Sequence, residues 1–142
     1  MNYEEIISGL RALKAEEFVD YVPERLSELT EAVMELPVPE RAIPELFAVM
    51  ERLPDSDLGS PGPLVHTLER LNYVDELVAS MRRCPTPLAI WMVNRILNSP
   101  LELERRQFFI ELLSSVAGHP QANESAQNDA ELFIEFQKGR RL

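Results

Sequence analysis

Side chains that commonly carry out chemistry are few in this chain of 142 residues. There are two histidines, His66 and His119, and one cysteine, Cys84. Neither histidine has the spacing of a metal-binding motif, and no histidine can be placed beside the Cys84 thiol to activate it. Glycine-rich phosphate-binding motifs and the Gly-x-Ser-x-Gly motif of hydrolases are absent from the sequence. We therefore expect a protein that is not an enzyme and needs no cofactor or metal ion.

The carboxylates, in contrast, are numerous and follow a helical rhythm. Between Val22 and Leu36, apolar residues recur at steps of three and four, which predicts one buried stripe along a helix. Glutamates keep the same rhythm on the opposite face, and two acidic residues continue it upstream: Glu24, Glu28, Glu31 and Glu35, preceded by Glu17 and Asp20. They form either a solvated face or a row that meets Arg and Lys of another protein. Like charges at this spacing repel one another, and because no lysine relieves the repulsion, we favour the second interpretation.

Two more carboxylates, Asp55 and Asp57, stand just before a loop that contains Gly59 and Gly62. The glycines could bend the chain around a phosphate, but the neighbouring acidic residues would repel one. We therefore count both aspartates with the acidic partner-binding residues.

A second candidate surface lies on segment 88–98, which is apolar around more than half of its circumference. The remaining wedge holds four residues at i, i+3, i+4 and i+7: Trp91, Asn94, Arg95 and Asn98. Trp and Arg are enriched among the energetically dominant residues of interfaces, and Asn both donates and accepts hydrogen bonds. Alternatively, a neighbouring helix covers the tryptophan while the polar side chains bond loop carbonyls, such as those of the 54–63 connection. The apolar character of the helix favours this alternative.

Helices are the elements that would position these side chains. Helical periodicity spans 2–14, 15–36 (kinked or broken at Pro23), 40–53, 61–71, 73–83, 87–98, 100–117 and 124–138. The eleven prolines lie at or near the segment edges, where a helix tolerates them. Ser60, Thr86 and Ser99 each precede a proline and are predicted helix N-caps. No segment shows the alternation of a strand.

The expected fold is an all-α single domain over residues 1–142, with about seven to nine helices in a helical-hairpin arrangement. Segments 22–53, 61–84 and 87–118 each resemble two helices joined by a short turn. Repeats of this size are typical of HEAT-like solenoids, and an irregular orthogonal bundle is the alternative.

Charge is distributed unevenly along the chain, whose formal net charge is −10. The acidic N-terminal half, residues 1–58, has 14 acidic and five basic residues. The central residues 59–118 include six of each kind, and the C-terminal helix region 119–142 has four against three. An acidic field attracts cationic partners and disfavours nucleic acid. Without a bilayer-spanning apolar run, a secretory signal or a second cysteine, we expect a cytoplasmic protein with no membrane partner.

Three short stretches resemble a known family: Leu58-Gly59-Ser60-Pro61-Gly62-Pro63-Leu64-Val65-His66, Cys84-Pro85-Thr86-Pro87, and Trp91-Met92-Val93-Asn94-Arg95-Ile96-Leu97-Asn98. They are similar to motifs of small all-helical immunity proteins encoded beside polymorphic toxins, including those of contact-dependent growth inhibition systems. The resemblance covers residues 55–100. It implies a cytoplasmic protein that binds a cognate toxin domain and blocks it, with the acidic first half as the specificity surface.

The resemblance and the charge distribution point to the same function. Many toxin domains of these systems are nucleases, which present a basic groove to phosphates, and a row of carboxylates could occupy that groove. Our leading hypothesis is an immunity protein that neutralises a basic toxin domain, such as a nuclease. The alternative is a HEAT-like adaptor or regulatory scaffold that binds a host protein. The sequence does not indicate the oligomeric state.

Overall fold

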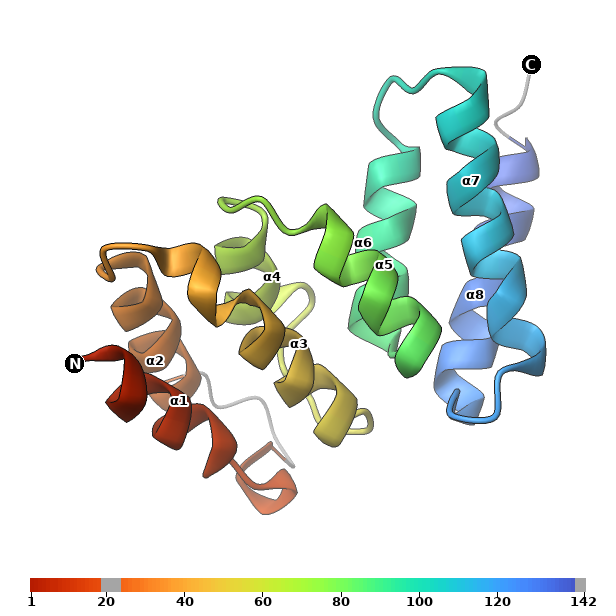
Figure 1. Ribbon diagram of the computed structural model, residues 1–142. Coiled ribbons are helices and arrows are strands. Elements are labelled where there is room, and N and C mark those ends of the chain that lie inside the picture. The colour runs from red at the N-terminus through yellow and green to blue at the C-terminus, as the bar shows by residue number, and fades with distance from the viewer. Residues whose placement is uncertain (19–23, 140–142) are drawn as a thin grey trace. The chain divides into compact units, whose positions relative to one another are not determined.

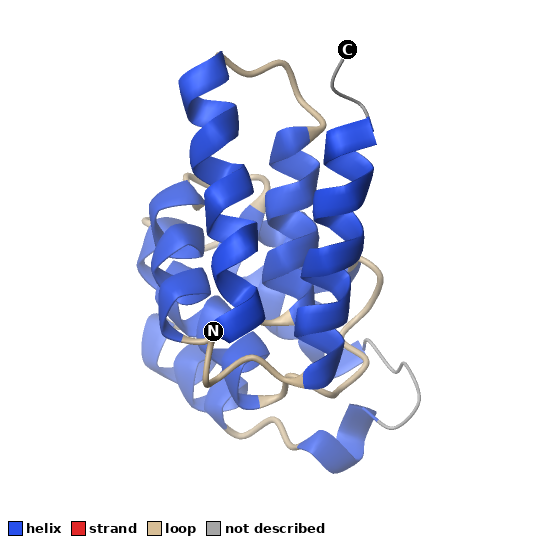
Figure 2. Ribbon diagram, turned by 90° about the vertical axis from the view of Figure 1, so that its right-hand side faces the viewer, coloured by secondary structure: helices blue, strands red, loops and turns tan. Residues whose placement is uncertain are grey.

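The computed structural model describes residues 1–18 and 24–139, and every regular element in those ranges is helical (Figures 1 and 2). Eight α-helices and three short 3-10 helices form these ranges of the chain. The predicted all-α fold class is therefore confirmed. None of the helices in the described ranges is long and apolar enough to span a lipid bilayer.

The chain consists of two compact units, Met1–Glu76 and Leu77–Leu142, within which residues contact one another more than they contact the other unit. The boundary does not coincide with either change in charge composition, near residues 58 and 118. Each unit has its own set of buried apolar side chains. The expectation of a single domain over 1–142 stays a prediction.

The first unit contains the helices α1 (Tyr3–Arg11), η1 (Ala15–Phe18), α2 (Glu24–Met34), η2 (Pro39–Ala42), α3 (Ile43–Arg52) and α4 (Gly62–Leu68). The predicted segment 15–36 is present as η1 and α2. Asp20, Val22 and the break expected at Pro23 lie outside the described residues. The predicted segment 40–53 is divided between η2 and α3, and α3 carries a proline in its first turn, where no hydrogen bond is lost.

A capping box fixes the start of α1. The Glu5 N–H donates to Asn2 Oδ1 at 2.8 Å, and the Asn2 N–H donates to Glu5 Oε1 at 3.1 Å. This reciprocal pair satisfies backbone donors that the first turn of a helix leaves unpaired. The apolar face of the helix that follows is buried, and Ile6 and Leu10 have no exposed surface.

The core of the first unit lies where the apolar faces of its helices meet. α1 packs against α2 and α3, and α4 packs against the same two helices. α2 therefore packs mainly on α1 and α4 rather than on α3, the partner that segment 22–53 suggested. Side chains with no exposed surface in this core include Ile6, Leu10, Leu26, Leu29, Val33, Leu46, Phe47, Leu64, Val65 and Leu68.

Gly9 allows α1 and α2 to approach each other closely. A Cβ atom at this position would lie 2.6 Å from Leu29 Cδ2 and 3.1 Å from Arg25 Nη2. The first distance is shorter than a carbon–carbon contact, so a larger residue would require the buried Leu29 side chain to move. The absence of a side chain at Gly9 thus leaves room for Leu29 of α2.

Polar contacts also join α1 to α3. The Arg52 guanidinium donates hydrogen bonds to the carbonyls of Leu10 (2.9 Å) and Leu13 (2.6 Å). The last carbonyls of a helix have no partner within it, and a cation there also complements the helix dipole. At the surface, the hydrogen bond from Arg11 to Glu45 raises the pKa of the Arg11 guanidinium.

The second unit is built from α6 (Pro87–Leu97), α7 (Leu103–Ser114), η3 (Ser115–Gly118) and α8 (Glu124–Gly139), while α5 (Val74–Arg83) crosses the boundary between the units. α6, α7 and α8 all pack against one another (Figure 1). The contact between α6 and α7 matches the helix pair predicted for 87–118.

The N-cap predicted at Thr86 is confirmed. Thr86 Oγ1 accepts a hydrogen bond from the Ala89 N–H at 3.3 Å, and Pro87 takes the first helical position. Because proline has no N–H to satisfy, it fits this place without loss.

The caps predicted at Ser99 and Ser60 are wrong. The Ser99 hydroxyl donates to the carbonyl of Ile96 in the preceding helix, and α7 begins only at Leu103. α4 begins at Gly62, whose φ of 83° requires a left-handed turn at the position where a capped helix would already have started.

A buried glutamine links the three helices of the second unit. Gln137 has no exposed surface, and its Nε2 donates to Asn94 Oδ1 (2.7 Å) and Asn98 Oδ1 (2.8 Å). Arg106 of α7 donates to Gln137 Oε1 (3.2 Å), to its backbone carbonyl (2.9 Å) and to the carbonyl of Leu97 (3.2 Å). The side-chain amide of Gln137 therefore uses both its N–H groups and its oxygen in hydrogen bonds, which offsets the free-energy cost of burying it.

His119 ties the connection between α7 and α8 to the end of α5. Its Nδ1 accepts a hydrogen bond from the Gln121 N–H at 3.0 Å. The proton of the neutral ring is therefore assigned to Nε2, which donates to the Arg82 carbonyl at 2.7 Å. From the sequence, this histidine was recognisable only as a residue near a helix end.

Replacing Gln137 by leucine should lower the free energy of unfolding by about 2–3 kcal/mol. The change leaves the buried Asn94 oxygen without its donor and removes an acceptor from Arg106. Urea unfolding followed by circular dichroism measures the effect. Gln107→Leu, at an exposed position of α7, is the control and should change the free energy by less than about 0.5 kcal/mol. Equal small losses in the two variants would contradict the structural role of Gln137.

Candidate partner-binding site

The acidic face of α2 is present as the helical spacing predicted. Glu24, Glu28 and Glu31 on α2 and Glu35, which directly follows the last residue of α2, are all exposed and form the row. The opposite face of the same helix is buried, with Leu26, Leu29 and Val33 fully covered. Burial of one face therefore holds the four carboxylates out toward solvent.

The repulsion within this row is smaller than we expected. Arg25 Nη1 lies 2.9 Å from Glu28 Oε1 and forms an ion pair one turn along the helix. The expectation that no basic residue relieves the repulsion between the glutamates was wrong, because it considered lysines and not Arg25. Both side chains are about half exposed, so the pair adds little stability, but it neutralises one of the four negative charges.

The other carboxylates predicted near this face have different surroundings. Glu17 is exposed in η1, and its Oε2 accepts a hydrogen bond from the Lys14 N–H at 2.6 Å. Asp55 is exposed in the loop after α3. Asp57 is exposed too, but its Oδ1 accepts from the Gly59 N–H at 3.1 Å. Gly59 has a φ of 106°, so the Asp57 carboxylate stabilises a turn that needs glycine.

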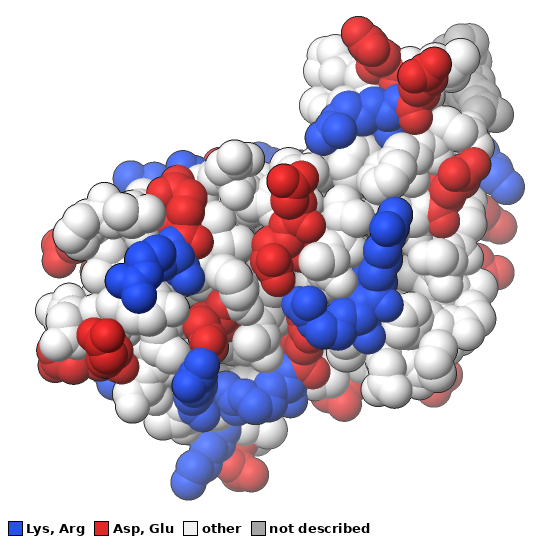
Figure 3. Space-filling view, viewed as in Figure 1, with Lys and Arg blue, Asp and Glu red and all other residues white. Residues whose placement is uncertain are grey.

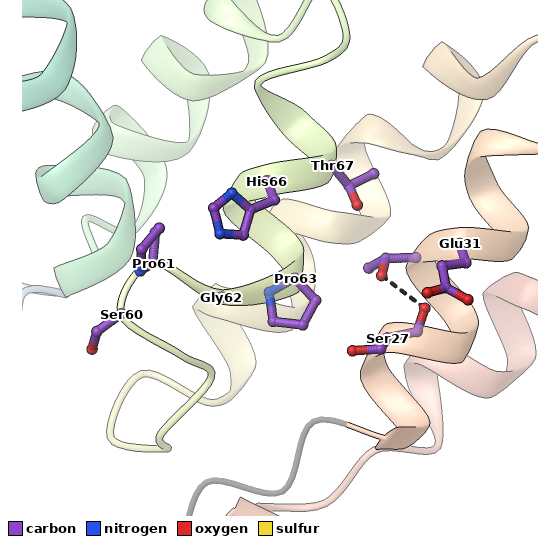
Figure 4. Close-up of a pocket in the computed structure, with 9 residues that line it drawn as sticks. Ser27, Glu31, Ser60, Pro61, Gly62, Pro63, His66 and Thr67 are labelled. Carbon is purple, nitrogen blue, oxygen red and sulfur yellow. Dashed lines mark hydrogen bonds between the residues drawn. The ribbon is translucent and has the colours of Figure 1, made fainter.

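Beside the acidic face lies a polar pocket between α2 and the start of α4, with a volume of about 480 Å³ (Figure 4). Four hydroxyl side chains, one carboxylate and one imidazole provide its polar lining. The lining residues are Ser27, Thr30, Glu31, Ser60, Pro61, Gly62, Pro63, His66 and Thr67. The pocket thus joins the row of glutamates to the loop whose motif resembles immunity proteins.

The two threonines line the pocket from otherwise buried positions. Thr30 is 2% exposed, and its hydroxyl donates to the Ser27 carbonyl at 3.1 Å, which leaves its oxygen lone pairs as acceptors. Thr67 is 7% exposed, and no hydrogen bond engages its hydroxyl within the described ranges. No buried side-chain oxygen of the described residues lacks both a partner and solvent contact, so the Thr67 hydroxyl reaches solvent through this pocket.

The sequence contained a signal for these threonines that we did not use. Thr30 follows Leu26 by four residues, and Thr67 follows Leu64 by three, so both fall on apolar helix faces. A small polar residue at such a position indicates either a local hydrogen bond or a polar cavity. The juxtaposition of α2 with α4 depends on long-range packing and had no local signal.

The wedge predicted on α6 does not form one surface. Asn94 is only 9% exposed, and it bonds the Gln137 side chain together with Asn98. Our assignment of Asn94 to a partner protein is therefore wrong, because its side-chain oxygen already accepts a hydrogen bond from Gln137 of α8. The hydrogen-bond partner of Asn94 is thus a side chain of α8 rather than the loop carbonyl considered as the alternative. Trp91 is half-buried, and the guanidinium of the exposed Arg95 lies 5.4 Å from the centre of its ring.

The two units differ strongly in charge. The first contains 17 acidic and six basic residues, and the second contains seven acidic and eight basic residues. On the face shown in Figure 3, basic side chains lie among the acidic ones, so the acidic residues do not cover this face evenly. The four glutamates of the row are four of the 17 acidic residues of the first unit.

The polar side chains of the row and the pocket can recognise a cationic group. In the ranges that the structure describes, no group of three or more His, Cys, Asp or Glu residues could hold a metal ion. Carboxylates, hydroxyls and an imidazole ring can accept hydrogen bonds from ammonium or guanidinium groups.

Comparisons of the chain with protein families, with curated proteins and with solved structures gave no significant match.

The role of Asp57 can be separated from its charge. Asp57→Ala should lower the free energy of unfolding by about 1 kcal/mol, because the Gly59 N–H loses its acceptor. Asp57→Asn keeps an oxygen in the same place and should leave stability within about 0.5 kcal/mol of the wild type. Urea unfolding of the two variants measures the difference. If the asparagine variant loses as much stability as the alanine variant, the charge matters rather than the turn.

Proposed function

We propose that this protein is a non-catalytic immunity protein, which binds a basic toxin domain and blocks it through the acidic face of α2. The observation that carries the proposal is the row of four exposed glutamates, three on a helix whose opposite face is buried and the fourth directly after its end. The row belongs to a unit with 17 acidic and six basic residues. The resemblance of residues 55–100 to immunity proteins adds the identity of the partner class.

A row of carboxylates can meet the basic side chains of a groove that normally holds a nucleic acid. At about 1.5 Å per residue, successive glutamates of the row are separated by about 4.5–6 Å along the helix axis, which is wider than the step of about 3.4 Å between phosphates of one DNA strand along the duplex axis. The match therefore depends on the long, flexible Arg and Lys side chains of the groove rather than on equal spacing. Long-range attraction accelerates the encounter.

The second candidate function is a HEAT-like adaptor or regulatory scaffold that binds a host protein. The contacts of α1 with α2 and of α6 with α7 favour it, since pairs of consecutive helices are the units of α-solenoids. Co-expression with the product of the adjacent reading frame separates the two functions. An immunity protein co-purifies with that product and protects cells from it, whereas an adaptor does neither.

Charge reversal tests the proposed role of α2. Changing Glu24, Glu28, Glu31 and Glu35 to Lys should leave folding intact, because all four side chains are exposed. Association with the toxin domain should slow by about tenfold or more at low salt, with a smaller change in the dissociation rate. Surface plasmon resonance at several salt concentrations measures both rates, and the wild-type association rate should fall steeply as salt rises.

The matched control reverses four exposed glutamates of the second unit, Glu104, Glu124, Glu131 and Glu135, and changes the net charge by the same amount. This variant should associate at least threefold faster than the α2 variant and should still protect cells. If the two variants behave alike, only net charge matters and α2 is a solvated face. Full protection by the α2 variant would refute its assigned role.

A further inference from the structure

The pocket between α2 and α4 has a polar lining with more acceptors than donors. Glu31 contributes a carboxylate, and Thr30 and Thr67 contribute hydroxyl oxygens from buried positions. Two of the remaining lining residues, Pro61 and Pro63, have no backbone N–H to offer. The Glu31 carboxylate would repel an anion, although the hydroxyls and His66 could also donate hydrogen bonds, and an apolar group would leave the hydroxyls without water.

The open hydrogen-bonding capacity lies at the pocket itself. Among the residues that the structure describes, the side chains of Glu31, Ser60, His66 and Thr67 make no hydrogen bond or ion pair with the protein. In Figure 4, Glu31 and Ser27 stand on α2 across from Pro63 and Thr67 on α4, while Ser60 and His66 flank the other end of the pocket. Polar groups of two helices and one loop thus line the pocket.

We propose that this pocket binds a single cationic side chain of the partner protein, the ammonium of a lysine or the guanidinium of an arginine. The Glu31 carboxylate supplies the opposite charge, and the oxygens of Thr30 and Thr67 accept the remaining N–H groups. A volume of about 480 Å³ admits either side chain together with ordered water.

The assignment of the occupant to a partner protein rests on the proposed function, whereas the selectivity for cations rests on the lining alone. The two roles also separate kinetically. Outer carboxylates such as Glu24 act at long range and change the association rate, while the pocket forms short contacts that change the dissociation rate. Glu31 contributes to both because it belongs to the row and to the pocket.

Nuclear magnetic resonance with small probes tests the pocket without a known partner. Butylammonium represents a lysine side chain, ethylguanidinium represents an arginine side chain, and butanol is the neutral control. At least one cation should give saturable amide shifts confined to residues 27–31 and 60–67, with a dissociation constant on the order of 1–10 mM. The tighter of the two cations identifies the preferred side chain, and butanol should give no saturable shift.

Variants then assign the contacts. Glu31→Gln should weaken binding of the cation about tenfold, and Thr67→Val about threefold. Glu24→Gln removes the same charge elsewhere on α2 and should change it less than about twofold. Thr67→Ser retains the hydroxyl and should bind like the wild type, which separates a lost contact from a disturbed fold.

The outcomes distinguish the pocket from the proposed function. Equal weakening by Glu24→Gln and Glu31→Gln, shifts spread along the whole of α2, or saturable shifts with butanol would overturn the cation pocket. Cation binding in the pocket without binding of any toxin domain would uphold the pocket and refute the immunity function. Binding of the toxin domain without a saturable probe shift up to about 100 mM, far above the expected dissociation constant, would refute the cation pocket and uphold the immunity function.

Discussion

Burial of the apolar stripe on α2 is the constraint on which the candidate site depends. Leu26, Leu29 and Val33 are fully covered where α1 and α4 meet α2. Each such side chain contributes about 1.5–3 kcal/mol when it leaves water, so a rotation of α2 about its axis is strongly opposed. The same helical period that buries the leucines places the glutamates on the outside. Contact of α2 with α4 also forms the polar pocket, so one packing arrangement creates both the row and the pocket.

Several polar side chains of the second unit bond one another or the backbone. Gln137 forms hydrogen bonds with Asn94, Asn98 and Arg106. His119, in the connection before α8, forms a hydrogen bond with the Arg82 carbonyl at the end of α5. These contacts use donors and acceptors that would otherwise be available to a partner. The contrast with the first unit is clear at the pocket, where Glu31 and Thr67 remain open to a ligand.

Local signals in the sequence predicted those features that depend on neighbours along the chain. The two faces of α2, the start of α6 at Thr86 and the helical character of every described segment follow from periodicity and capping. Features that depend on distant residues were missed or misread. Asn94 was assigned to a partner because its true neighbour, Gln137, lies 43 residues away. The Arg25 pair was local and visible, and we overlooked it by considering only lysine.

Gly9 adds a consequence for how such a molecule can diversify. Gly9 leaves room for the buried Leu29 of α2, and neither residue belongs to the exposed row. The residues that pack α2 and the residues of the row are therefore different. Substitutions in the row could change which partner is bound with little effect on folding, whereas a larger residue at position 9 would disturb the packing of Leu29.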